Sequence, residues 1–366
     1  MDVNSVFVSN KDAKINGYTI QSITRGTPCN GDVGIEIEME GNKFFKNNTT
    51  LNEIGWSYHK DGSLRGHDNA EYVLTSPIKF SDVPDSVNKL WKIINDFGTK
   101  LDESNRTSVH VHLNCQQFHV NRLASFAALY FCFEEILTEY CGDHRVGNLF
   151  CLRAKDASGI VTKLRKFIQT DMRSELTEGL HYANFNIHAL YKFGSIEIRS
   201  MRGPDNPQMV IDWVSILERL YTVSADFSDP RQICDLFSQQ GPLSFFESIL
   251  GDKAFFLMQN ISFNQEQIRN SLYEGIRIAQ DLCYCRDWDK FNPINLKPDP
   301  FGRKPQKIAQ YINAADPSWI THSIGSVPST TVQGLDNAYS TANTAEPVEI
   351  VDIESPDFEE LDWDDD

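Results

Sequence analysis

The sequence predicts an α+β fold in which an antiparallel sheet presents one polar face. Short segments alternate apolar and polar residues with the period of a strand, and longer segments between them repeat apolar residues at helical spacing. A turn-rich loop containing Gly41, Asn47 and Asn48 follows the first of these strands. We expect strands over residues 33–40, 56–59, 71–76, 108–114, 182–189 and 195–201, and helices over 84–97, 122–141, 158–169 and 207–224, with helices only across 230–288.

The strand predicted over residues 33–40 carries three acids on one face. Glu36, Glu38 and Glu40 occupy alternate positions, and apolar residues stand between them. Carboxylates gathered in this way repel each other unless a cation lies among them. Mg²⁺ and Mn²⁺ prefer oxygen ligands, and strands hold such ligands rigidly. The segment therefore predicts a metal site, with an edge strand that exposes its acids to solvent as the alternative.

The same alternation recurs in three further segments, and none of the four contains lysine. A face that is merely solvated would be richer in Lys, Thr and Ser. The pattern therefore predicts a site spread over one sheet. The polar faces of the three segments carry His110, His112 and Asn114; Asn184, Asn186 and His188; and Glu197 and Arg199.

The order of these motifs resembles the amidoligase family of the glutamine synthetase and glutamate–cysteine ligase superfamily, over roughly residues 31–225. One departure is Thr107-Ser108-Val109, which stands where small, Gly-rich residues are common in the family. The resemblance implies a curved antiparallel sheet with a glutamine synthetase-like active-site face and flanking helices, and a phage or bacterial origin. In chain order, the matching residues are Gly34, Glu36 and Glu38; Asp61, Ser63, Glu71, Ser76 and Pro77; His110 and His112; Arg145 and Asn148; Asn184 and Asn186; and Glu197 and Arg199.

An ATP- and Mg²⁺-dependent carboxylate–amine ligase is the activity that the resemblance implies, with Mn²⁺ as an alternative ion. Such an enzyme forms an amide or isopeptide bond through an acyl phosphate, from a carboxylate and an amine on a small molecule, peptide or protein. The sequence contains no Gly-x-x-x-x-Gly-Lys-Ser/Thr motif, so ATP is not expected in a P-loop.

The residues of the motifs suit this chemistry, because a transferred phosphoryl group needs its charge neutralised. We expect metal ligands at Glu36, Glu38, Glu71, His110 and Glu197. His110 is also a candidate phosphate ligand, and His112 a donor to phosphate or substrate. Arg199 suits the transferred phosphoryl group. Arg145 and Arg202 suit phosphate or a second carboxylate of the substrate. Asn184 and Asn186 are expected to orient substrate or nucleotide.

Each assignment has an alternative. In the structural alternative, Glu197 and Arg199 form an ion pair on one face of the strand, and Arg145 and Asn148 only terminate the helix that ends at 141. Asp61 and Ser63 equally suit a turn. The alternative functions are an ATP-dependent phosphotransferase resembling the guanidino kinases, a metal-dependent hydrolase, and a non-catalytic interaction protein that acts through its C-terminal tail.

The net charge of −17 is concentrated at the C-terminus. Residues 308–366 contain 13 acids and neither Lys nor Arg, which leaves −4 for the rest of the chain. We expect a disordered acidic tail over residues 321–366, either solubilising or docking a basic partner. Nucleic-acid binding is not expected, because the sequence contains no basic patch with interleaved aromatic residues.

The remaining organisation is that of a cytoplasmic protein. We expect an entry hairpin over residues 1–30 with its best strand at 18–23, a catalytic domain over 31–228 and a mainly helical extension over 229–320. No secretory signal or membrane span is recognisable. Eight scattered cysteines are typical of reduced thiols, so we expect the cytoplasm, or the host cytoplasm for a phage protein.

Overall fold

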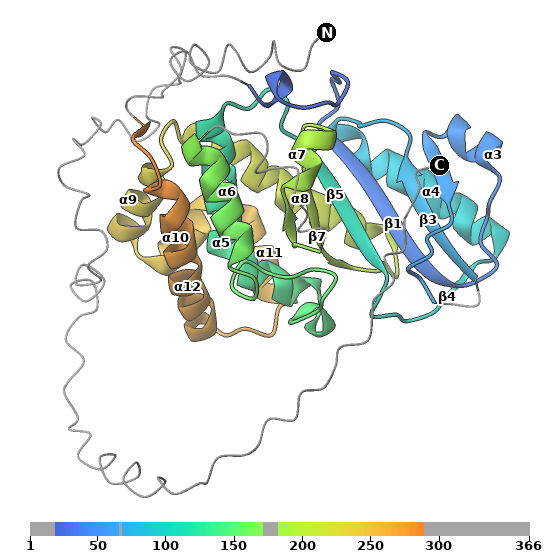
Figure 1. Ribbon diagram of the computed structural model, residues 1–366. Coiled ribbons are helices and arrows are strands. Elements are labelled where there is room, and N and C mark those ends of the chain that lie inside the picture. The colour runs from blue at the N-terminus through green and yellow to red at the C-terminus, as the bar shows by residue number, and fades with distance from the viewer. Residues whose placement is uncertain (1–18, 66–67, 171–181, 289–366) are drawn as a thin grey trace, which may run out of the picture. The chain divides into compact units, whose positions relative to one another are not determined.

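A computed structural model of the chain describes residues 19–65, 68–170 and 182–288 (Figure 1). All of them lie in one compact unit, Met1–Asp316. None of the helices in these ranges is long and apolar enough to cross a membrane. The acidic tail expected over residues 321–366, most of the entry hairpin and the end of the helical extension lie outside the described residues.

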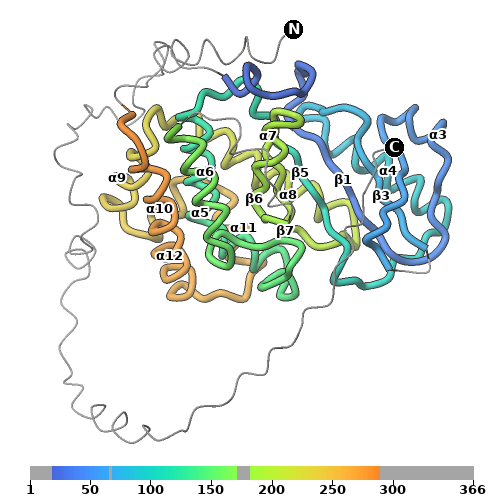
Figure 2. The backbone as a smooth tube through the Cα atoms, viewed as in Figure 1, coloured from blue at the N-terminus to red at the C-terminus, as the bar shows by residue number. Residues whose placement is uncertain are grey.

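Seven strands in the described ranges form one open antiparallel sheet, which confirms the predicted α+β class. Its order is β2-β3-β1-β5-β7-β6, and β4 pairs with β1 beside this path. Figure 2 shows β1, β5 and β7 next to one another. The strands are β1 (Val33–Asn42), β2 (Trp56–His59), β3 (Asp68–Leu74), β4 (Lys100–Leu101), β5 (Ser108–Asn114), β6 (Phe185–Asn186) and β7 (Ser195–Arg202).

The three central strands have one apolar and one polar face. Ile35 pairs with Val111, which pairs with Ile198, and all three side chains are buried. Glu36 pairs with His110 on the opposite side. Shifting a strand by one residue would turn its apolar side chains away from the core, so burial fixes which residues face the other way. We call the face that carries Glu36 and His110 the polar face.

Three long helices cover the apolar face: α4 (Val83–Phe97), α5 (Val120–Cys141) and α8 (Pro207–Val223) (Figure 1). α4 has a proline in its first turn, and Gly98, whose φ of 74° is left-handed, caps its C-terminus. The side chain of Asn206 caps α8 by accepting the backbone N–H of Met209. α5 is buried on nearly all sides because helices also pack against its other face.

Five further helices in the described ranges form a second layer around α5. α12 (Gln265–Cys283) lies along α5, and Gly275 permits their close approach because a Cβ there would stand 2.4 Å from the carbonyl oxygen of Cys132. A capping box between Asn264 and Gln267 begins α12. The other helices of this layer are α6 (Gly159–Thr170), α9 (Arg231–Gln240), α10 (Pro242–Leu250) and α11 (Asp252–Asn260).

Three local predictions are wrong. Residues 20–22 form the 3₁₀ turn η1 (Ile20–Ser22) rather than a strand. The loop after β1 contains α3 (Asn48–Glu53), because the side chain of Asn47 accepts two backbone N–H groups and caps a helix.

The strand predicted over residues 182–189 consists only of β6, and α7 (His188–Lys192) follows at once. Asn186 Oδ1 accepts the backbone N–H of His188 at 2.9 Å, a side-chain bond that competes with the sheet ladder. His188 therefore begins a helix and does not continue the polar face of a strand.

Candidate functional site

Three rows of polar side chains cross the polar face, each built from residues that pair between neighbouring strands. The middle row lies on β1 and β5, and the outer rows extend to β3, β6 and β7. Cross-strand pairing brings the side chains within each row close together. The rows are Glu71, Glu38, Ser108 and Arg202; Glu36 and His110; and His112, Glu197 and Asn186.

Glu36 is the centre of this arrangement. Its Oε2 lies 3.1 Å from His110 Nδ1, and its Oε1 lies 3.1 Å from His112 Nε2. Burial by itself would raise the pKa of Glu36, but the hydrogen bonds and charges of the two histidines outweigh it and hold the pKa well below its usual range. Glu36 is therefore an ionised carboxylate with an imidazole on each oxygen.

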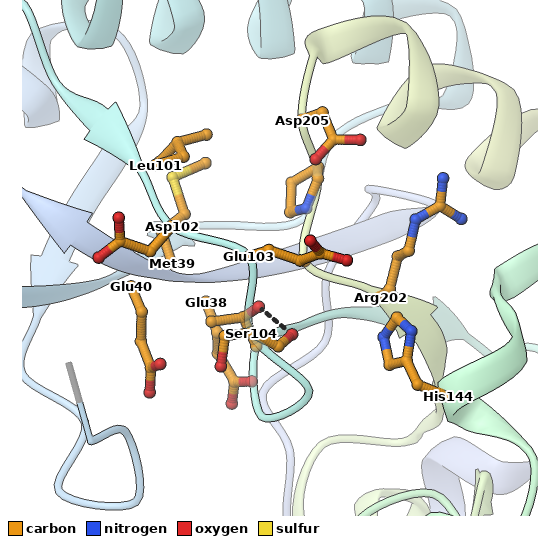
Figure 3. A pocket seen from close by; sticks show the side chains of 13 residues that line it. Glu38, Met39, Glu40, Leu101, Asp102, Glu103, Ser104, His144, Arg202 and Asp205 are labelled. Carbon is orange, nitrogen blue, oxygen red and sulfur yellow. Dashed lines mark hydrogen bonds between the residues drawn. The ribbon is translucent and has the colours of Figure 1, made fainter.

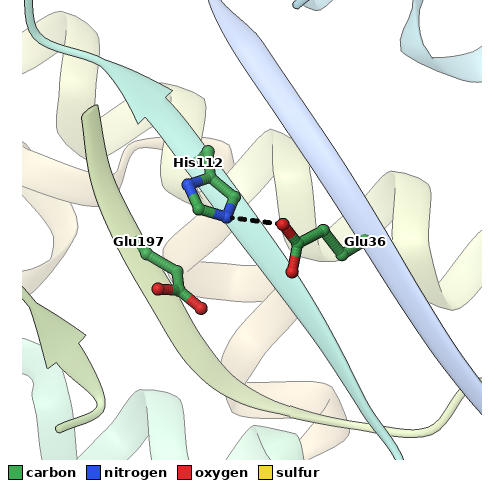
Figure 4. Close-up of side chains that lie close together, drawn as sticks. All are labelled: Glu36, His112 and Glu197. Atoms are coloured by element: carbon green, nitrogen blue, oxygen red, sulfur yellow. Dashed lines mark hydrogen bonds and ion pairs between the residues drawn. The ribbon is translucent and has the colours of Figure 1, made fainter. Parts of the chain in front are cut away.

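Glu36, His112 and Glu197 together form a candidate metal triad (Figure 4). One potential ligand atom from each residue lies within 4.8 Å of the other two. Two carboxylates and one imidazole suit a divalent ion. His112 Nδ1 lies 3.3 Å from Ser195 Oγ, which orients the ring with Nε2 toward Glu36. The donor set thus fits an ion, although the sequence interpretation gave His112 a different role, that of a donor to phosphate or substrate.

His110 is engaged on both ring nitrogens. Nε2 lies 2.7 Å from Ser108 Oγ, and Nδ1 faces Glu36 and, at 3.5 Å, Glu197 Oε1. Ser108 Oγ also donates to Glu38 Oε2 at 2.5 Å. The buried ring thus links the carboxylates of β1 to that of β7, whereas the sequence interpretation assigned it as a direct ligand of metal or phosphate.

Glu38 and Glu71 form a second pair of carboxylates, opposite each other on β1 and β3. Burial, together with the negative charges of Glu36, Glu38 and Asp61, raises the pKa of Glu71 to about 7. Asp61 accepts hydrogen bonds from both the backbone and the hydroxyl of Ser63, so these two residues form a turn beside the site. The Glu38–Glu71 pair offers oxygen ligands to a second cation.

Arg199 supplies the positive charge among these acids. Its Nη1 donates to Glu197 Oε1 and lies 3.5 Å from His110 Nδ1. Burial alone would raise the pKa of Glu197, but the charges of Arg199, His112 and His110 together outweigh burial and lower the pKa below its usual value. The other carboxylate oxygen of Glu197 accepts Nδ2 of Asn186 at 2.7 Å. Arg199 and Asn186 therefore fix the rotamer of one member of the triad.

Arg145 and Asn184 lie outside the polar face. The buried guanidinium of Arg145 donates to two backbone carbonyls of β7, from Nε to Ser200 at 2.8 Å and from Nη2 to Arg199 at 2.6 Å. Asn184 is fully buried, and its Nδ2 donates to Glu134 of α5 at 3.1 Å. The structure thus does not bring these two predicted site residues together with the others.

Two cavities adjoin the polar cluster toward opposite ends of β1. Glu36 lines one and Glu38 the other. Figure 3 shows the larger, of about 420 Å³, which we call the acidic cavity. The titratable side chains of its lining are Glu38, Glu40, Asp102, Glu103 and Asp205 with Arg202 and His144. The smaller, of about 300 Å³, we call the apolar cavity; Val73, Leu74, Pro77 and Phe193 line it together with Glu36 and His112.

Several residues of the site were not found by sequence reasoning. Ser108 and Ser195 stand in phase with His110 and Glu197, so extending the alternation to the strand ends would have found both. Asp102, Glu103 and Asp205 enter from loops, and no periodicity marks them. Arg202 was a predicted candidate, but it reaches the polar face because the register of β7 shifts between its pairing with Val111 and with Val109.

The fold and the site define an α+β protein with an open antiparallel sheet and a candidate metal centre of carboxylates and imidazole on its polar face. Residues 56–202 match the model of a protein family described as "Putative amidoligase enzyme". This is the family that the motifs resemble, so the resemblance is confirmed for this part of the chain. The match includes β3, β5 and β7, whereas β1 with Glu36 and Glu38 precedes it. A comparison with curated proteins gives no match.

Proposed function

We propose that the polar face is the active site of a carboxylate–amine ligase that uses ATP and Mg²⁺, or Mn²⁺ in its place. One observation carries the proposal: the triad Glu36, His112 and Glu197 lies beside Arg199, with a cavity toward each end of β1. The family match supports the ligase class. A ligase needs neutralised phosphate charge and room for more than one reactant, and this arrangement offers both.

The proposed reaction has two steps. First, an oxygen of the carboxylate substrate attacks the γ-phosphorus of ATP, the bond to the bridging oxygen breaks, and ADP leaves. Then the amine nitrogen attacks the acyl carbon, phosphate leaves with the oxygen, and the nitrogen loses a proton. Both steps move negative charge among phosphate oxygens, so fixed positive charge accelerates them.

The residues of the polar face would divide this work. Glu36, His112 and Glu197 would hold one ion and the Glu38–Glu71 pair a second, and these ions would neutralise phosphate oxygens. Arg199 would bind the transferred phosphoryl through its fork of N–H donors. His110 and Ser108 would keep Glu36 and Glu38 in place through the hydrogen bonds described above. The two cavities would receive the nucleotide and the reacting carboxylate and amine.

Thermal unfolding with Mg²⁺, ATP, both and neither tests the proposal without knowledge of the substrates. A ligand at 100 times its Kd stabilises the native state by about 2.7 kcal/mol. We expect stabilisation that needs both ATP and Mg²⁺ in the wild type and is lost in Glu36→Gln/Glu38→Gln. The control variant Glu53→Gln/Glu247→Gln makes the same chemical change at two exposed sites and should behave like the wild type.

Hydroxylamine then tests for the acyl phosphate, because it would trap that species as a hydroxamate when a carboxylate substrate is supplied. A nucleotide effect that survives in Glu36→Gln/Glu38→Gln would place ATP elsewhere and contradict the proposal.

A metal-dependent hydrolase is a second candidate, favoured by the triad itself. Three protein ligands around one ion leave a position for water, and a bound ion lowers the pKa of that water. Stabilisation by Mg²⁺ or Mn²⁺ alone, with no added effect of ATP, would favour this candidate over the ligase.

A further inference from the structure

Arg199 and Arg202 present an unusual geometry, because residues three apart in a regular strand point to opposite faces. Both nevertheless belong to the polar side: Arg199 contacts Glu197, and Arg202 pairs with Ser108 and lines the acidic cavity. The register explains this. Val111 of β5 pairs with Ile198, but Val109 pairs with Met201, so β7 contains one extra residue. This β-bulge re-aims the side chains that follow it.

The bulge leaves buried backbone groups that the sheet ladder does not satisfy, and groups from outside the sheet bind them. The carbonyls of Arg199 and Ser200 both accept hydrogen bonds from the guanidinium of Arg145, which is 1% exposed. Ser200 Oγ lies 3.0 Å from the hydroxyl of Tyr130 on α5. The N–H of Arg199 donates to the carbonyl of Asn184 at 3.0 Å. Side chains from α5 and from η3 (Asp143–Arg145) therefore bind the bulge directly.

We propose that Arg145 and Tyr130 are positioning residues, which hold the β7 bulge so that Arg199 and Arg202 both reach the polar face. This inference rests on the proposed function where it concerns phosphate, because Arg199 is assigned there to the transferred phosphoryl. Arg145 itself would not touch substrate, because two of its three nitrogens bind backbone carbonyls and the third is buried. A lysine would keep the charge but would not reproduce the planar pair of donors that spans two adjacent carbonyls.

Hydrogen exchange of residues 196–202, followed by mass spectrometry on the nucleotide-free protein, tests whether the bulge depends on these side chains. Tyr130→Phe removes one hydroxyl and keeps the ring. Arg145→Lys removes the planar pair of N–H donors and keeps the charge. We expect exchange in this segment to become about threefold to tenfold faster, as the loss of one hydrogen bond implies. Tyr72→Phe is the matched control, because Tyr72 is equally buried and donates one hydrogen bond, to the carbonyl of Phe45. Tyr72 lies on β3, which β1 and β5 separate from β7.

A double-mutant cycle then tests whether the bulge acts through Arg199. We expect Arg145→Lys to weaken Mg·ATP binding about tenfold in the wild-type background and to have no further effect in the Arg199→Ala background. Unchanged exchange over residues 196–202, or equal effects in Tyr72→Phe, would overturn the positioning role. Additive losses in the cycle would show that Arg145 acts independently of Arg199. A wild-type protein that binds no Mg·ATP would contradict the proposed function alone, because the exchange experiment still decides on the bulge.

Discussion

Glu71 lies among carboxylates that could bind a metal ion, and a proton would compete with the ion for its carboxylate. Its pKa of about 7, raised by burial and by its acidic neighbours, means that it keeps a proton through most of the acidic range. Metal binding must release that proton. We therefore expect the affinity for Mn²⁺ to rise between pH 6 and pH 8, by at most about tenfold per pH unit for one proton.

Titration calorimetry at several pH values measures this dependence. In Glu71→Gln the affinity should be lower and its rise with pH shallower, because the competing proton is gone. Equal affinities of the wild type at pH 6 and pH 8 would contradict a role for Glu71 in binding the ion.

Glu134 on α5 should make the stability of the fold depend on pH. Burial raises its pKa from 4.5 to about 8, even though it accepts hydrogen bonds from Ala154 N and Asn184 Nδ2. The folded state thus holds a proton that the unfolded chain has lost above pH 4.5. This contribution to stability is complete below about pH 4.5 and is lost as the pH rises to 8, with a slope of at most about 1.4 kcal/mol per unit.

Urea unfolding at pH 5, 6.5 and 8 tests this prediction. Glu134→Gln should lose less stability than the wild type between pH 5 and pH 8, whereas Glu53→Gln, on the surface of α3, should follow the wild type. Parallel curves for all three proteins would show that Glu134 is ionised in the folded state.

At the level of single residues, alternation along strands predicted the polar face well. Glu36, Glu38, His110, His112, Glu197 and Arg199 all lie on it, because burial of the alternate residues leaves no other orientation. The same rule did not predict the position of Asn184, whose side chain turns toward Glu134 just before β6 begins. It also could not place Arg202, since a bulge depends on groups from other parts of the chain.

At the level of elements, the contact between α5 and α12 depends on a single glycine. A Cβ at Gly275 would stand 2.4 Å from the carbonyl oxygen of Cys132 and 2.6 Å from that of Phe131, and backbone cannot move aside as a flexible side chain can. We expect Gly275→Ala to lower the free energy of unfolding by about 1–3 kcal/mol despite the better helix propensity of alanine.

Chemical denaturation of Gly275→Ala beside Gly62→Ala provides the measurement. Gly62 has open space around its Cβ position, so that variant should be neutral. A Gly275→Ala protein as stable as the wild type would mean that α12 can move away from α5 without loss.

Long elements were predictable because their apolar periodicity extends over several turns or residue pairs, as in β5, α5 and α8. Short ones were not. α3, α7 and β6 are set by a capping asparagine or by a partner strand rather than by any periodic pattern. The predicted domain boundaries and the glutamine synthetase-like shape of the sheet stay predictions.

At the scale of the whole molecule, the residues of the polar face and the acidic C-terminal segment occupy different parts of the sequence. Every residue of the three rows lies between Glu36 and Arg202, within the unit Met1–Asp316. Residues 317–366 contain 12 acids and no Lys or Arg. We expect a chain ending at residue 316 to keep the full metal-dependent rise in thermal stability. Loss of that rise would show that the acidic segment takes part in binding, as an interaction protein acting through its tail requires.

The order of the sheet also has a kinetic consequence. The triad takes Glu36 from β1, His112 from β5 and Glu197 from β7, strands that are neighbours in space but distant in sequence. Such contacts form only after large loops have closed, so the ligand set is absent until the centre of the sheet has assembled. We expect saturating Mn²⁺ to slow unfolding in stopped-flow experiments and to leave the refolding rate unchanged. Faster refolding in Mn²⁺ would instead mean that these three strands meet before the rate-limiting barrier is crossed.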